Sequence, residues 1–118
     1  MAENIKEQIE NKVIDCIVAG AMGRMVVFKP DKLNVDLIVE KRGDYKTKTI
    51  GLNIYDGQPS ESISIVPKEN LYLMFVNFNK VTQDIADNFI VVPSNNMQNK
   101  LSMTKKSFVG FLIEKLGK

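Results

Sequence analysis

A basic segment in the first half of the chain is suited to contact phosphate. Lys41, Arg42, Lys46 and Lys48 place four cations within eight residues, and Tyr45 lies among them. Cationic side chains neutralise backbone phosphates and an aromatic ring stacks on bases, so this composition predicts a hairpin that contacts nucleic acid. The alternative is a solvated turn whose charges prevent strand pairing with other chains.

The residue types that the chain lacks restrict the catalysis open to it. There is no histidine and Cys16 is the one cysteine, which excludes Ser-His-Asp and Cys-His catalysis, histidine metal sites, intrachain disulfides and four-thiolate zinc sites. Carboxylates, lysines, tyrosines and hydroxyls remain for chemistry. Cys16 lies on the apolar stripe of a predicted helix, so we interpret it as a core residue.

Length and composition predict a single domain over residues 1–118. The chain is 44% hydrophobic and 25% charged, and its formal charge is +2, so any surface for nucleic acid must be local. No apolar run approaches the roughly 20 residues of a membrane helix, and the start of the chain lacks the order of a signal peptide. We therefore expect a cytoplasmic protein with no membrane partner.

Apolar periodicity predicts a helix near each end of the chain and strands between them. Ile5, Ile9, Val13 and Ile17 recur at helical spacing and predict a first helix over about residues 3–19. The other predicted elements are strands at 25–28, 35–40, 49–55, 71–76 and 89–92, and a helix capped by Thr104. The polar turn after residue 40 makes the second and third strands an antiparallel hairpin. This order predicts an α/β fold with a mixed sheet of about five strands, flanked by the terminal helices.

Two short motifs lie in the predicted hairpin. The segment 34–40, NVDLIVE, places Asp36 at the start of a strand, and the segment 49–55, TIGLNIY, places Asn53 two residues before Tyr55. The pattern resembles the PD-(D/E)XK, or restriction-endonuclease-like, superfamily. In that family an acid begins the second strand, and an acid or amide precedes a lysine by two places on the third. The later strands also resemble the family, so the likeness covers about residues 3–95.

The resemblance implies a degenerate active site. It places Asp36 at a metal-ligand position, Asn53 where an acid would stand and Tyr55 where the lysine would. A metal-dependent nuclease needs carboxylates for Mg²⁺ and a cation for the developing charge, whereas asparagine and tyrosine are uncharged near pH 7. Glu10, as the helix acid of the family, and Lys48 are the foremost replacements for the lost charges. Further candidates are Glu7, Glu40, Lys41 and Asp56.

These observations favour a catalytically eroded nuclease-like domain that acts as a binding or scaffolding module, with DNA or RNA as a candidate partner. Two alternatives stay open. The first is a divergent Mg²⁺-dependent nuclease centred on Asp36, which is the one case that implies a cofactor. The second is a protein-interaction or oligomeric module, a homodimer included. For Asp36 itself the structural alternative is an acceptor for a loop amide or a partner of Lys32.

Overall fold

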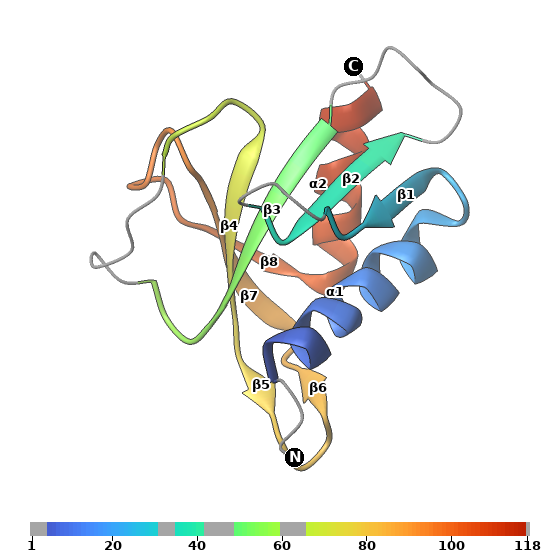
Figure 1. The fold of residues 1–118 in the computed structure, drawn as a ribbon, viewed down its shortest axis with the longest axis vertical. Coiled ribbons are helices and arrows are strands. Elements are labelled where there is room, and N and C mark those ends of the chain that lie inside the picture. The colour runs from blue at the N-terminus through green and yellow to red at the C-terminus, as the bar shows by residue number, and fades with distance from the viewer. Residues whose placement is uncertain (1–4, 31–34, 42–48, 60–65, 118) are drawn as a thin grey trace.

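The described chain begins and ends with a helix, and its strands lie between them (Figure 1). A computed structural model describes residues 5–30, 35–41, 49–59 and 66–117. The elements are α1 (Ile5–Ala21), β1 (Met25–Phe28), β2 (Leu37–Lys41), β3 (Thr49–Asp56), β4 (Leu71–Val76), β5 (Phe78–Asn79), β6 (Asp84–Ile85), β7 (Asn88–Pro93), β8 (Leu101–Thr104) and α2 (Lys105–Gly117). None of the helices in these ranges has the length and apolar content needed to cross a bilayer.

Within the described residues, the main sheet has six strands in the order β1-β2-β3-β4-β7-β8. β3 and β4 are parallel, and the other neighbouring pairs are antiparallel. The hairpin predicted from the polar turn is confirmed, because β2 pairs with β3 in antiparallel register and Leu37 lies opposite Leu52. The chain is therefore an α/β domain with a mixed sheet, as its sequence predicts.

Two elements differ from the sequence-based expectation of about five strands. β8 adds a sixth strand to the sheet and pairs with β7, with Ser102 opposite Ile90. The segment between β4 and β7, for which no element is predicted, contains the short β5–β6 hairpin. The turn of this hairpin is held by the Asn79 side chain, whose Oδ1 accepts hydrogen bonds from the backbone amides of Val81 (2.8 Å) and Thr82 (3.2 Å).

The main core lies between the two helices and one face of the sheet. In β3 the alternating Ile50, Leu52 and Ile54 pack in this core, because successive side chains of a strand point to opposite faces. In Figure 1, α2 lies behind β2 and β3, so the other face is toward the viewer. A smaller apolar cluster occupies that other face. Its members are Leu73, Phe75 and Val92, with Tyr55 and Ile90 packed against them.

Candidate functional site

Asp36 lies immediately before β2, where β3 extends past the end of its partner. The β2–β3 ladder ends at the pair Leu37 and Leu52. One residue beyond, the Asp36 side chain takes over the pairing, because its Oδ2 accepts a hydrogen bond of 2.7 Å from the backbone N–H of Ile54. The carboxylate therefore continues the ladder in place of a main-chain carbonyl.

Asn53 makes the reciprocal contact across the same two strands. Its Oδ1 accepts a hydrogen bond of 3.1 Å from the backbone N–H of Asp36, which also donates to the carbonyl of Leu52 at 3.0 Å. Asn53 is buried, with 8% of its surface exposed, so its amide must find partners inside the protein. The two motif positions thus lie close together, and each side chain binds the backbone of the opposite segment.

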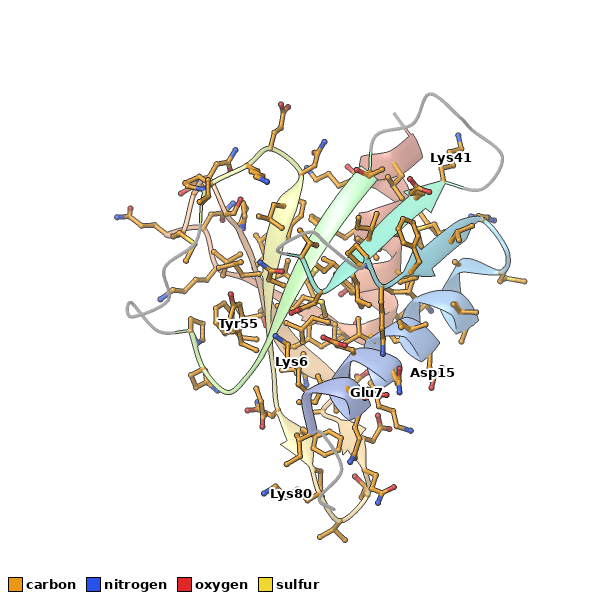
Figure 2. All side chains as sticks on the ribbon, viewed as in Figure 1. Lys6, Glu7, Asp15, Lys41, Tyr55 and Lys80 are labelled. Atoms are coloured by element: carbon orange, nitrogen blue, oxygen red, sulfur yellow. The ribbon has the colours of Figure 1, made fainter. Side chains whose placement is uncertain are left out.

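Lys6 of α1 forms an ion pair with the second carboxylate oxygen of Asp36. Its Nζ lies 3.1 Å from Asp36 Oδ1, and Figure 2 shows the labelled Lys6 next to the β3 strand that carries Tyr55. Sequence reasoning offered Lys32 as the ion-pair partner, and Lys32 lies outside the described residues. Lys6 was not predicted, although its spacing of four from Glu10 places both side chains on one face of the helix.

Glu10 lies one helical turn after Lys6 and reaches the same site. Its Oε1 is 3.7 Å from the Nζ of Lys29, which also donates to Asn11 Oδ1 at 3.0 Å. Burial raises the pKa of Glu10 above its ordinary value, and the negative charge of Asp36 raises it further, whereas Lys29 and Lys6 lower it. The two carboxylates are therefore close enough to repel each other, and each has an ammonium group beside it.

Tyr55 follows Asn53 by two residues, but its ring packs against the smaller apolar cluster, on the face of the sheet opposite the helices. The ring stacks on Phe75, with 5.3 Å between centroids and 19° between planes. Burial, and then the charge of Asp36, raise the pKa of its hydroxyl. Tyr55 is thus a neutral packing residue beside the site, and it supplies no cation.

Three further candidates that the structure describes lie away from this site or make other contacts. Lys41 is exposed at the far end of β2, and Figure 2 shows it well apart from Lys6 and Tyr55. Glu40 is also at that end, since it lies opposite Thr49. Asp56 Oδ1 accepts a hydrogen bond of 3.2 Å from the backbone N–H of Phe78. The other three predicted cations, Arg42, Lys46 and Lys48, lie outside the described residues.

The donor set does not fit a divalent metal ion. Within the ranges that the structure describes, no group of three or more His, Cys, Asp or Glu side chains is placed to hold a metal. Mg²⁺ prefers an octahedron of oxygen ligands, whereas both oxygens of Asp36 and the Oδ1 of Asn53 already accept hydrogen bonds or contact an ammonium. These side chains join α1, β2 and β3. Their charges are paired, Lys6 with Asp36 and Lys29 with Glu10.

Comparison with known proteins returns no relative for this chain. No family model, no curated protein and no solved structure matches it. The conclusions below therefore rest on the residues and geometry described above.

Proposed function

We propose that this chain is a catalytically inactive domain of the restriction-endonuclease-like fold that works as a binding module. The observation that carries the proposal is that both oxygens of the Asp36 carboxylate have partners. One accepts a hydrogen bond from the Ile54 amide and the other forms an ion pair with Lys6. Asp36 and Asn53 lie side by side at the start of β2, and the charge of Asp36 acts on Glu10 of α1, which supports kinship with the family. Their acceptor atoms serve the backbone and the neighbouring lysines, which supports loss of catalysis.

The physical reason is that a metal would have to compete with contacts that hold the fold together. A hydrogen bond to a charged group contributes about 1.5–3 kcal/mol, and a buried amide that loses its acceptor incurs a comparable cost. Freeing Asp36 Oδ2 for another ligand would leave the Ile54 amide without that acceptor. The site is therefore better suited to stabilise the junction of α1, β2 and β3 than to bind and release a cofactor.

Nucleic acid is the partner class that we propose for this module. The Asp36 site itself is unsuited to phosphate, because Lys6 and Lys29 are matched there by Asp36 and Glu10. Lys41 is exposed at the start of the basic segment and at the opposite end of β2. This separation supports a phosphate-contacting surface that is independent of the eroded site.

A cleavage assay tests the loss of catalysis. Labelled single- and double-stranded DNA and RNA are incubated with the protein in Mg²⁺ or Mn²⁺, beside EDTA and an Asp36→Ala variant. We expect no cleavage in any arm. Cleavage that disappears both with EDTA and in Asp36→Ala would overturn the proposal of an inactive domain.

A binding titration tests the partner class separately. Fluorescence anisotropy of labelled oligonucleotides should show affinity that falls with salt, because phosphate contacts release counterions. Lys41→Ala should weaken binding and reduce the salt slope by about one unit. Lys80→Ala is the matched control, since Lys80 is an exposed lysine at the tip of the β5–β6 hairpin (Figure 2). Equal effects of the two variants, or no binding, would contradict the proposed surface.

A divergent nuclease is the second candidate function, and one observation favours it. Glu10 comes from the first helix, and the negative charge of Asp36 raises its pKa, which supports an interaction between the two carboxylates. The cleavage assay separates the two candidates directly. A Glu10→Gln variant that loses activity together with Asp36→Ala would establish the nuclease.

A further inference from the structure

A groove between the two helices takes no part in the proposed function. It lies between α1 and α2, has a volume of about 530 Å³, and is lined mainly by small and apolar residues. These include Cys16, Ala19 and Gly20 of α1 and Val109, Gly110 and Ile113 of α2. Lys105 and Lys106 also line the groove, and Lys105 forms an ion pair with Asp84.

Gly20 and Gly110 both line the groove, and their surroundings differ. At Gly20 an added Cβ would lie 2.8 Å from a methyl carbon of Val109, so packing of α1 on α2 explains this residue. At Gly110 an added Cβ would meet no heavy atom within 4 Å. A glycine inside a helix costs about 1 kcal/mol relative to alanine, and no contact within the described chain explains that cost at Gly110. Close approach of another backbone from outside would explain it.

Opposite charges lie symmetrically on either side of Gly110. Lys106 and Glu114 stand four residues before and four residues after it, so the three residues form one row along α2. Both charged side chains are exposed, and neither makes an ion pair with another residue that the structure describes. If a second α2 crosses antiparallel at Gly110, Lys106 of each copy lies beside Glu114 of the other.

We propose that two copies of this chain pair through the α1–α2 face about a two-fold axis near Gly110. A two-fold interface must be self-complementary, and the row Lys106-Gly110-Glu114 meets this condition because reversal exchanges its charges. The glycine permits close contact of the two α2 helices, and the second copy covers the apolar groove beside it. This dimer is independent of whether the chain binds nucleic acid or cleaves it.

Analytical ultracentrifugation of the full chain over a wide concentration range tests the pairing. The wild type should sediment as a monomer–dimer equilibrium. Gly110→Leu should be monomeric at every concentration, because its side chain would occupy the space that the second copy needs. The variant should fold at least as stably as the wild type, since the position is open and leucine favours helix. Thermal unfolding measured by circular dichroism checks this point.

Charge reversal tests the symmetry of the interface. Lys106→Glu and Glu114→Lys should each weaken the dimer by about tenfold, because each single change replaces two attractions with two repulsions. The double variant carries the same row in inverted order and should recover wild-type affinity. Lys100→Glu changes an exposed lysine in the segment between β7 and β8 and should leave the dimer unchanged.

Three results would each overturn the proposal. The first is a wild type that stays monomeric at all concentrations. The second is a dimer that persists in a folded Gly110→Leu variant, which would place the interface elsewhere, such as the edge strand β1. The third is a double charge variant that dimerises no better than the two single variants.

Discussion

The helix-side core and the Asp36 junction hold the same sheet by different means. In the core, side chains such as Phe108 and Leu52 are fully buried and contact apolar neighbours. At the junction, Asp36 and Asn53 add side-chain hydrogen bonds beyond the end of the β2–β3 ladder, and Lys6 forms an ion pair with Asp36. Apolar packing stabilises in proportion to buried area and does not depend on pH. The junction instead depends on charge state and on a few specific atoms.

The largest effect that we expect comes from the core. Phe108 is fully buried and lies edge-on to Phe89, with 5.3 Å between ring centroids. Phe108→Ala should lower the free energy of unfolding by about 3–5 kcal/mol, because it removes apolar contacts and leaves a cavity. Urea unfolding followed by circular dichroism measures the loss. The control is Phe28→Ala on the edge strand β1, where the ring is 40% exposed, and an equal loss there would contradict the distinction.

An intermediate effect is expected at the junction. Asp36→Ala removes the acceptor of the Ile54 amide and the partner of Lys6, so the free energy of unfolding should fall by about 1.5–3 kcal/mol. Asp36→Asn keeps an acceptor without the charge and should lose about half as much. Asp15→Ala, at an exposed position on α1, is the control for removing a carboxylate. If both Asp36 variants unfold at the wild-type urea concentration, the junction does not stabilise the fold.

The smallest expected effect is the pH dependence of stability that comes from Glu10. The apolar core has no such dependence, so this effect distinguishes the two regions. The pKa of Glu10 is raised in the folded protein, so the folded state binds this proton more tightly than the unfolded state does. Stability from this group is therefore fully present below the ordinary value of 4.5, and it is lost as pH rises through the folded pKa. Relative to Glu10→Gln, the wild type should gain melting temperature as the pH is lowered from 7 toward that value.

The control for the pH experiment is Glu69→Gln, which removes an exposed carboxyl in the segment before β4. Melting temperatures of the three proteins are compared across the same pH series. If the wild type and Glu10→Gln show parallel pH profiles, the burial of Glu10 and its repulsion by Asp36 have no measurable net effect on folding.

Periodicity was sufficient to predict most of the helices and strands of the main sheet. The alternation of Ile50, Leu52 and Ile54 predicted the strand at 49–55, and the continuous apolar run predicted the doubly covered strand at 71–76. β8 was missed because it has four residues and ends in Thr104, which was interpreted as a helix cap. Thr104 does both, since its Oγ1 also accepts the hydrogen bond of 3.1 Å from the Ser107 amide.

The candidate site could be predicted only in part. The sequence indicated the antiparallel hairpin that carries both Asp36 and Asn53, and the family resemblance singled out these two positions. The approach of Lys6 and Glu10 depends on how α1 crosses the sheet, and no local pattern specifies that angle. The structural alternative for Asp36, an acceptor for a loop amide, is close to what is found, but the donor is the Ile54 amide of β3. Which amide is bound depends on where β2 begins, and the sequence locates that residue only to within one or two positions.

The position of α2 has a consequence for the folding kinetics of the domain. The Sγ of Cys16 lies 3.7 Å from the carbonyl oxygen of Lys105, a contact between residues 89 positions apart. Formation of the α1–α2 contact therefore closes a long loop, with an entropic cost that local pairing of β1, β2 and β3 does not carry. Proteins whose contacts join distant residues fold slowly. The helical layer should accordingly assemble after the β1–β2–β3 meander, and changes at Gly20 should affect the folding rate less than the unfolding rate.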